Sequence, residues 1–373
     1  MIFIVTLTAK IQIFPSEEEK ELLLSTTRQY TKACNFISDH VFRTNDLSQP
    51  SLNKQVYHKL RETYMLKAQM AQSAIKSVIA AYKTILTNQK EWIQPDFQHV
   101  YCDLVWNRDY SLRPGFFSVN TLSGRLKLPY VQKGMEQYFD GTWKFGTAKL
   151  LTKHGKWFLH IPASKDIPEL PNFSVKNIVG IDLGMNFLAV SYDSTGKSRF
   201  YSGRQVKHRR AKYKQLRRAL QRRQTPSARR RLKRIGSREN RWMSDINHQV
   251  SKALVESAPA GTLFVLEDLT GIHNVTEKVC LERRYEAVSW TFYDLRKKIE
   301  YKAGFRGSRA IAVDPRHTSQ TCPKCGHTEP GNRSKKLHVF CCKTCGYRSN
   351  DDRIGAMNLH RKGIEYLSAV TGE

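Results

Sequence analysis

The chain has 373 residues, of which 40% are hydrophobic and 10% aromatic, so it can build two or three folded domains and is too apolar for a disordered protein. Its 62 lysines and arginines against 33 aspartates and glutamates give a formal charge of +29, which favours nucleic acid as partner ahead of an anionic membrane surface. The longest apolar stretches, such as 178–181 and 262–266, are too short to cross a membrane.

The first ten residues carry no basic residue ahead of their apolar part, so they are not expected to form a signal peptide. Of the eight cysteines, five crowd between positions 322 and 345, unlike the cysteines of a secreted disulfide scaffold. We therefore expect a protein of the reducing cytoplasm, with no membrane partner.

The N-terminal region predicts one strand followed by helices. Residues 3–14 alternate apolar and polar side chains, as a strand does. Ser16 can cap a helix that has three glutamates in its first turn and continues to about Phe42. After a polar break, a second helical stretch is predicted from about Lys54 to Glu91.

From about Pro95 to Pro171 the pattern changes to short strands punctuated by Gly, Asn and Asp. With residues 3–14 these strands can form one barrel that the helical block interrupts. Their mixture of aromatic and basic residues suits an RNA-binding surface, and equally a sheet core with solvated edges. The strands are predicted at 101–106, 115–119, 124–127, 147–151 and 157–161.

A strongly basic helical stretch follows three antiparallel strands predicted between Asn177 and Tyr201. From Arg204 to Arg241 there are seventeen lysines and arginines and one acid, Glu239, so the charges cannot be balanced by pairing along the helix. Thr225-Pro226-Ser227 divides the stretch into two helices. Phosphate contact is the favoured interpretation, and the candidate residues are Arg204, Lys207, Arg209, Arg210, Lys212, Lys214, Arg217, Arg218, Arg222 and Arg223.

The C-terminal half alternates helices and strands, which predicts an α/β fold with a mixed sheet flanked by helices. Helices are expected at 244–256, 289–303 and 352–367, and strands at 262–267 and 309–313.

Two Cys-x-x-Cys pairs match the spacing of a zinc ribbon. They are Cys322-Pro-Lys-Cys325 and Cys342-Lys-Thr-Cys345, each followed by glycine in a tight turn. Four thiolates close a tetrahedral site, so the zinc is expected to be structural. Cys342 is preferred to the adjacent Cys341 because it restores the second pair; the remaining alternatives are His317, His327 and His338.

Two carboxylates occupy positions where burial is costly without a cation. Asp182 lies inside the apolar run 178–183, and Glu267 ends the apolar run 263–267. Together with a third acid at a helix start they could hold Mg²⁺ for phosphodiester cleavage. By pattern alone, Asp182 could instead be a turn residue, and Glu267 could pair with a basic helix.

At this point the motifs resemble those of the TnpB (OrfB) family, which is related to compact type V CRISPR effectors. The segments 180–184 and 266–269 resemble its first two RuvC motifs, 318–326 its zinc ribbon, and 290–304 its bridging helix. The segment 351–358 resembles the third RuvC motif and makes Asp352 the third carboxylate, with Asp351 as the alternative. Ile354-Gly355-Ala356 stands where the family usually has Asn-Ala-Ala.

The resemblance implies an RNase H-like RuvC nuclease domain with an inserted zinc ribbon, and an N-terminal wedge β-barrel interrupted by a helical recognition domain. It implies an endonuclease that a guide RNA from the transposon end directs to double-stranded DNA beside a short transposon-associated motif. Two Mg²⁺ ions, or Mn²⁺, would be held by Asp182, Glu267 and Asp352. A transposase encoded by the same element is a further possible partner, and the implied location is the prokaryotic cytoplasm, in association with the nucleoid.

The chain is expected to divide into six segments: a wedge strand at 1–14, recognition helices at 15–93, the wedge barrel at 94–170, a first nuclease segment at 171–311, the zinc ribbon at 312–349 and a second nuclease segment at 350–373. Three alternative functions stay open. The chain could be a guided DNA-binding repressor without cleavage, a compact type V CRISPR effector, or a transposase that joins DNA by itself.

Overall fold

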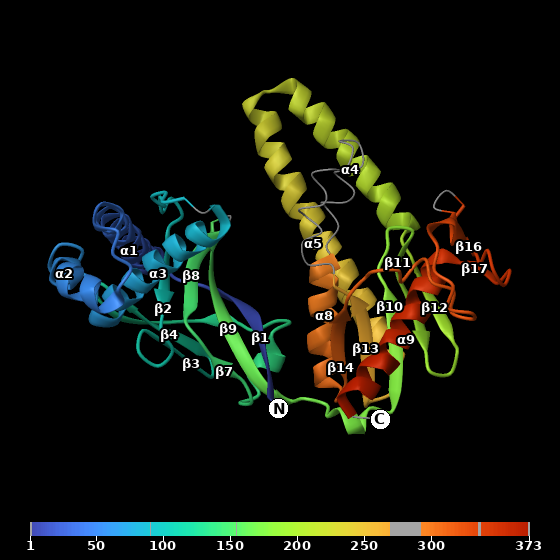
Figure 1. Cartoon of the computed structure of the whole chain (residues 1–373). Coiled ribbons are helices and arrows are strands. Elements are labelled where there is room, and N and C mark those ends of the chain that lie inside the picture. Colours follow the sequence, from blue (N-terminus) through green and yellow to red (C-terminus); the bar gives the residue numbers. More distant parts are fainter. Residues whose placement is uncertain (1, 90, 154, 269–291, 335–336, 372–373) are drawn as a thin grey trace. The chain divides into compact units, whose positions relative to one another are not determined.

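The computed structural model describes residues 2–89, 91–153, 155–268, 292–334 and 337–371 (Figure 1). The chain forms two compact units, one from Ile4–Asp166 and one made largely of the residues from Ile167 onward. Within the described ranges, no helix has the length and apolar character needed to cross a bilayer.

The first unit begins with a strand and three helices that pack on a sheet. Strand β1 (Ile2–Ile13) precedes α1 (Glu17–Thr44), α2 (Gln49–Glu62) and α3 (Ala68–Gln89). Ser16 forms the predicted cap of α1, since its hydroxyl accepts the backbone N–H of Glu19 and the Glu19 carboxylate accepts the N–H of Ser16.

The helical region after α1 differs from its prediction. A single stretch was expected from about residue 54, whereas α2 already begins at Gln49, with Pro50 in its first turn, where proline's missing N–H costs nothing. The chain then turns through Met65, which has a φ of 56°, so α2 and α3 are separate helices.

Two sheets complete the first unit. One has six strands in the order β2-β8-β9-β1-β6, with β7 also paired to β9, and the other has three in the order β3-β4-β5. The five predicted strands appear, while β3, β6 and β7 were not predicted. The bounds are β2 (Tyr101–Leu104), β3 (Tyr110–Arg113), β4 (Phe116–Thr121), β5 (Gly124–Leu128), β6 (Tyr130–Val131), β7 (Lys144–Phe145), β8 (Ala148–Lys153) and β9 (Lys156–Pro168), with a 3₁₀ turn η1 (Glu136–Tyr138).

The second unit is built on a five-stranded sheet in the order β12-β11-β10-β13-β14. Strand β11 runs antiparallel to β10 and β12 antiparallel to β11, whereas β13 runs parallel to β10 and β14 parallel to β13. The bounds are β10 (Asn177–Asp182), β11 (Phe187–Asp193), β12 (Ser198–Ser202), β13 (Thr262–Glu267) and β14 (Arg309–Val313), after a 3₁₀ turn η2 (Asn172–Ser174).

Helices cover both faces of this sheet. On one face, Val179, Ile181 and Phe264 pack against the end of α5 (Pro226–Glu256) and against α8 (Phe292–Phe305). On the other face, Ile178 and Val265 pack against α9 (Asp351–Thr371). Residues 289–291 of the helix predicted at 289–303 lie outside the described residues.

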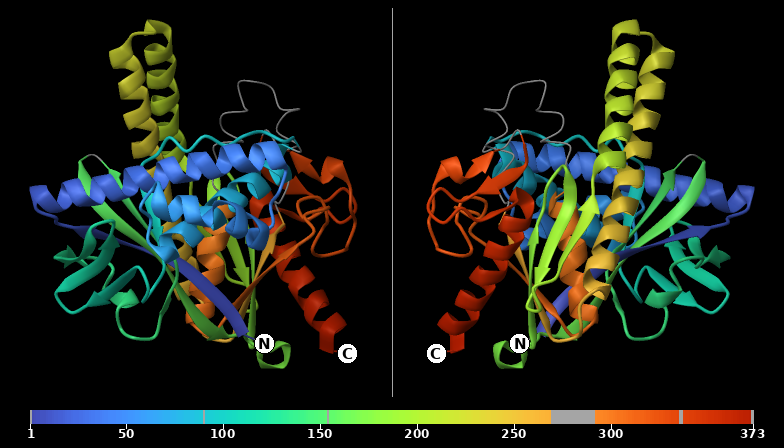
Figure 2. Two further views of the ribbon diagram at one scale, coloured as in Figure 1. Left: turned by 90° about the vertical axis from the view of Figure 1, so that its left-hand side faces the viewer. Right: turned by 90° about the vertical axis from the view of Figure 1, so that its right-hand side faces the viewer.

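The basic stretch forms a long hairpin of two helices that stands clear of the sheet in both views of Figure 2. Helix α4 (Arg204–Arg223) ends at Gln224, and Thr225 caps α5 through its hydroxyl. Two helices were expected in the region that α5 occupies, but α5 runs unbroken to Glu256 because no breaker separates them. Leu220, Ala228 and Ile235 form the apolar contact between α4 and α5.

A small sheet of three short strands carries the cysteines and leads into α9. Its strands are β15 (Arg333–Ser334), β16 (Val339–Cys341) and β17 (Arg348–Asn350), after a 3₁₀ turn η4 (Pro330–Asn332). Strand β17 is followed directly by α9, so this sheet and the helix start are one continuous piece of chain.

Candidate active site

Two of the predicted acids end neighbouring parallel strands. Asp182 is the last residue of β10 and Glu267 the last residue of β13, and the residues before them, Ile181 and Leu266, are register partners. The two carboxylates therefore meet at the same edge of the sheet. The buried strands Ile178–Ile181 and Leu263–Leu266 fix this placement through packing on both faces.

The start of α9 brings Asp352 to the same edge, and glycines allow the close approach. A Cβ on Gly180 of β10 would overlap the carbonyl oxygen of Ala356 and the backbone nitrogen of His360. A Cβ on Gly355 would lie 2.9 Å from Cγ of Asp182. Helix and strand backbones are thus in direct contact, with Asp352 one turn before the residues that touch β10.

Burial raises the pKa of each of the three carboxyl groups. The pKa of Asp182 is raised well above its ordinary value by burial, and further by repulsion from Glu267 and Asp352. Burial also raises the pKa of Glu267, against the effect of a hydrogen bond from Thr318. The pKa of Asp352 is raised by burial and then by Asp351. A bound cation would relieve all three shifts.

Asp351 and Asp352 have different surroundings. The Asp351 side chain is fully buried; it accepts a 2.8 Å hydrogen bond from Nε of Arg333 and lies 3.5 Å from Nδ1 of His338. Its other oxygen accepts the backbone N–H of Asp352 at 3.0 Å. Asp352 lies 3.8 Å from Nη2 of Arg333. Protein donors thus occupy Asp351, which leaves Asp352 as the better cation ligand.

Three residues of the site were not predicted. The hydroxyl of Thr318 donates to Oε1 of Glu267 at 2.5 Å. The amide of Asn358 donates to the carbonyls of Thr318 and Thr321 at 2.6 and 2.8 Å, which ties α9 to the segment before the cysteines. Arg333 faces the acids from β15. The only signal in the sequence was that Thr318 and Asn358 fall within segments that resemble family motifs; Arg333 had none.

The four predicted cysteines converge. Among the described residues, Cys322, Cys325, Cys342 and Cys345 form the one group of metal donors within 4.8 Å of one another. The sulfur pairs 322–345 and 325–342 are each 3.6 Å apart, close to the roughly 3.8 Å edge of a tetrahedron with 2.3 Å zinc–sulfur bonds.

The cysteines sit on two matching turns. The N–H of Gly326 donates to the carbonyl of Cys322 at 2.9 Å, and that of Gly346 to Cys342 at 3.0 Å. Both glycines have positive φ, 76° and 70°, which other residues rarely adopt. Cys341 is exposed on β16 and outside the group, so the geometry favours Cys342.

Asp182, Glu267 and Asp352 offer only carboxylate oxygens as donors. All-oxygen donors are the ligands that Mg²⁺ and Mn²⁺ prefer.

The ten basic candidates of α4 divide into three groups by burial and pairing. Arg210 and Arg217 approach the buried carboxylate of Glu239 in α5, so they link the two helices. Lys214 is half-buried. The others are largely exposed, and Lys207 donates to Oδ1 of Asn186 close to the acids: Arg204, Lys207, Arg209, Lys212, Arg218, Arg222 and Arg223.

Comparisons with known proteins show which families and structures this chain resembles. A family model described as "Probable transposase" (OrfB_IS605) matches residues 160–270, and one described as "Cas12f1-like, TNB domain" matches 292–359. The "Putative RNA-guided DNA endonuclease InsQ" of Escherichia coli K12 is 26% identical over 96% of this chain and 92% of its own length.

Other relatives match a smaller share of this chain. A "CRISPR-associated endodeoxyribonuclease Cas12f1" of Sulfoacidibacillus thermotolerans is 27% identical over 63% of this chain and 57% of its own, and one of Syntrophomonas palmitatica is 27% identical over 69% and 55%. The chain thus spans about half the length of these two Cas12f1 relatives. A solved Cas12f1–sgRNA–target DNA complex contains a chain of similar fold, with a TM-score of 0.60 at 14% identity, covering 96% of this chain and 99% of that one.

The fold is therefore an α/β nuclease fold of the Cas12f kind, carrying a cysteine cluster suited to zinc. Within this class, the resemblance to the TnpB (OrfB) family that the motifs predicted is confirmed.

Proposed function

We propose that the chain is an RNA-guided DNA endonuclease whose second unit is a RuvC-type, RNase H-like nuclease domain. The convergence of Asp182, Glu267 and Asp352 at one edge of the sheet carries this proposal. The strand order, with an antiparallel hairpin beside three parallel strands, supports it. So do relatives that are named RNA-guided and CRISPR-associated endonucleases.

Asp182, Glu267 and Asp352 would hold two Mg²⁺ ions, or Mn²⁺, and the four cysteines would hold Zn²⁺. When bound, the paired ions activate a water and stabilise the leaving oxygen of the cleaved phosphodiester. Thr318 fixes the orientation of Glu267 through its hydrogen bond. Arg333 places a positive charge beside Asp352 and partly offsets the mutual repulsion of the acids.

The exposed basic residues of α4 would contact nucleic-acid phosphates. Seven lysines and arginines on one helix that contains no acid create a strongly positive helix face. Arg210 and Arg217 are left out of this role because they pair with Glu239. The partners would be a guide RNA from the transposon end and double-stranded DNA beside a short motif. A transposase of the same element remains within the proposal.

The division into six segments belongs to the same proposal. Residues 1–14 and 94–170 would form the wedge barrel, 15–93 the recognition helices, 171–311 and 350–373 the nuclease, and 312–349 the zinc ribbon. The helices between β1 and β2 and the small sheet before α9 are consistent with it.

The test is guided cleavage by the purified protein. RNA that copurifies with the protein is sequenced, and its variable end defines a matching DNA substrate. Wild-type protein should cut this DNA with Mg²⁺, while Asp182→Ala should bind guide and target without cutting. The matched control is Asp314→Asn, an exposed acid just after the neighbouring strand β14, which should cut normally. Wild-type protein that only binds would indicate a repressor, and strand-transfer products without RNA would indicate a transposase.

A further inference from the structure

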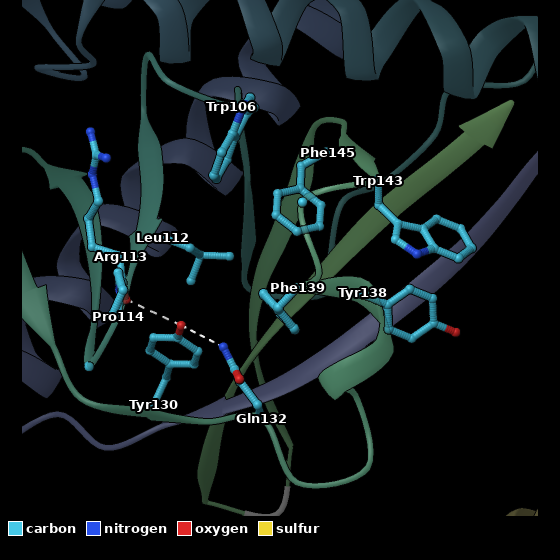
Figure 3. A pocket seen from close by; sticks show the side chains of 12 residues that line it. Trp106, Leu112, Arg113, Pro114, Tyr130, Gln132, Tyr138, Phe139, Trp143 and Phe145 are labelled. Carbon is cyan, nitrogen blue, oxygen red and sulfur yellow. Dashed lines mark hydrogen bonds between the residues drawn. The ribbon is translucent and has the colours of Figure 1, made fainter.

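A cavity of about 620 Å³ opens in the first unit, and all the residues that line it belong to that unit. Six aromatic side chains surround it, as Figure 3 shows, and they come from separate stretches of chain. The volume lies within the range of small-ligand pockets, roughly 300–1,000 Å³. The rings are Trp106, Tyr130, Tyr138, Phe139, Trp143 and Phe145.

The rings support one another instead of filling the space. Phe139 and Phe145 have centroids 5.6 Å apart, and Trp106 meets Phe145 edge-on at 5.0 Å. Tyr138 meets Trp143 edge-on at 5.0 Å. Except for the buried Tyr138, the rings are half-buried, so each of these five leaves some of its surface at the cavity. Aromatic surface left open in this way is costly in water and indicates a ligand that covers it.

Polar contacts hold one wall in place. The amide of Gln132 donates to the Tyr130 hydroxyl at 2.8 Å, and that hydroxyl donates to the carbonyl of Arg113 at 3.3 Å. The ring of Tyr130 is therefore oriented before any ligand arrives, which lowers the entropy cost of binding. The carbonyl oxygen of Gln132 can still accept a hydrogen bond from a ligand edge.

The side chains that line the cavity carry positive charge and no negative charge. Arg113 is exposed and is the single charged member of the lining, and neither Asp nor Glu is among the residues that line the cavity, all of which are described. A site for a basic or proline-rich peptide would gain from acids at its rim. The aromatic rings of the cavity lie beside the guanidinium of Arg113. Together they match a ligand in which an aromatic ring is linked to a phosphate group.

We propose that this cavity binds an unstacked nucleobase of single-stranded RNA, with Arg113 contacting the phosphate next to that base. The inference rests on the proposed function, in which RNA is a partner, and adds a site for one base within it. Base-on-aromatic stacking tolerates any base, because each has a π face. The cavity therefore selects for an unpaired nucleotide more than for a particular sequence.

Site-specific crosslinking tests this. The full chain in EDTA is mixed with single-stranded RNA of about 12 nucleotides that carries 4-thiouridine, irradiated, and its crosslinked peptides are identified by mass spectrometry. Added salt weakens phosphate contacts made elsewhere, while stacking persists. Peptides lining the cavity should crosslink, and a double-stranded RNA of the same length should not label them.

Two variants sharpen the test. Phe139→Leu keeps an apolar side chain but removes the ring, and Arg113→Gln removes the charge; each should lower crosslinking at the cavity about tenfold. Crosslinks to residues 204–241 provide the internal reference and should not change. The matched controls are Phe36→Leu, a half-buried ring stacked on Tyr64 outside the cavity, and Arg28→Gln, an exposed arginine of α1.

The outcomes separate the two proposals. If wild-type protein crosslinks along 204–241 but not at the cavity, or if both variants label like wild type, the nucleobase site is wrong and guided cleavage is untouched. If the wild-type protein crosslinks RNA nowhere, both proposals are wrong. If a proline-rich peptide competes with the RNA and abolishes crosslinking at the cavity, while adenosine monophosphate does not, the cavity is a peptide groove. That result would overturn the proposed nucleobase site.

Discussion

Asp351 and Asp352 are adjacent residues whose substitutions should separate stability from chemistry. Asp351 is fully buried with Arg333 bound to it, so Asp351→Asn breaks a buried ion pair and should lower the free energy of unfolding by about 3–5 kcal/mol. Asp352→Asn removes a carboxylate whose charge is disfavoured by burial and by the neighbouring Asp351. It should leave thermal stability nearly unchanged and lower Mg²⁺-dependent cleavage by more than about a hundredfold.

Melting curves and cleavage rates of the purified Asp351→Asn and Asp352→Asn variants test these two predictions. The reverse pattern, with Asp351→Asn inactive but stable and Asp352→Asn unfolded, would move the cation ligand to Asp351.

Gly180 shows how a single missing side chain holds the site together. Any Cβ there would collide with the backbone of Ala356 and His360, which cannot move aside as a flexible side chain could. We expect Gly180→Ala to lower the melting temperature and to reduce cleavage by separating α9 from β10. The matched control is Gly304→Ala in α8 of the same unit. A Cβ on Gly304 would make only ordinary contacts, the nearest at 3.7 Å, so this change should be neutral or stabilising by up to about 1 kcal/mol. Equal melting temperatures for the two variants would contradict this account.

At the scale of elements, the α4–α5 hairpin uses its arginines in two ways. Arg218 is largely exposed, whereas Arg210 is buried beside Glu239. Arg218→Gln should weaken nucleic-acid binding and reduce the slope of log affinity against log salt by about one, with no change in stability. Arg210→Gln should instead cost about 1–3 kcal/mol of stability and leave that slope unchanged. Fluorescence anisotropy across salt concentrations, together with thermal melting, distinguishes the two effects.

The contact between α5 and α8 should make stability depend on pH in a defined window. Burial, together with repulsion by Lys298 and Lys252, lowers the pKa of Lys302 from 10.5 to about 8. Between these values the unfolded chain holds a proton that the folded chain has lost, so this lysine makes stability rise with pH from about 8 to 10.5.

Lys302→Met removes that titration. The melting temperature of wild type minus that of Lys302→Met should therefore increase from about pH 7 to about pH 10. A difference that stays flat or falls over this range would show that Lys302 keeps an ordinary pKa in the folded protein.

At the scale of the whole molecule, periodic and buried segments were predictable from the sequence, while contacts made by isolated side chains were not. Strand β14 was predicted with the bounds it has, and the Cys-x-x-Cys spacing predicted four sulfurs that do converge. The separation of α2 from α3 depends on one residue with positive φ, Met65, which alternation patterns do not report. The division of the α4 arginines depends on Glu239, whose partners only the packing of two helices decides.

The candidate active site shows the same limit of prediction from the sequence. Burial of Asp182 and Glu267 followed from their apolar runs, but Asp352 needed the family resemblance, and Arg333 lies in a segment with no periodic pattern. Its proximity to Asp351 and Asp352 arises because β15, β16 and β17 fold back on the start of α9. A contact created by such a short sheet cannot be read from spacing alone.

The cysteine cluster should therefore act on cleavage from a distance. Cys322 and Cys342 are buried in one apolar cluster with Phe340 of β16 and Ile354 of α9, and metal loss would release the strand that carries Arg333 and the segment that carries Thr318. Because ligand binding and folding are coupled in such ribbons, Cys342→Ser should lose bound zinc, lower the melting temperature and impair cleavage even with excess Mg²⁺. Cys341→Ser, one residue away and exposed, should retain zinc and activity. Zinc content by mass spectrometry, measured beside cleavage, decides between them, since zinc loss in Cys341→Ser with retention in Cys342→Ser would reverse the ligand assignment.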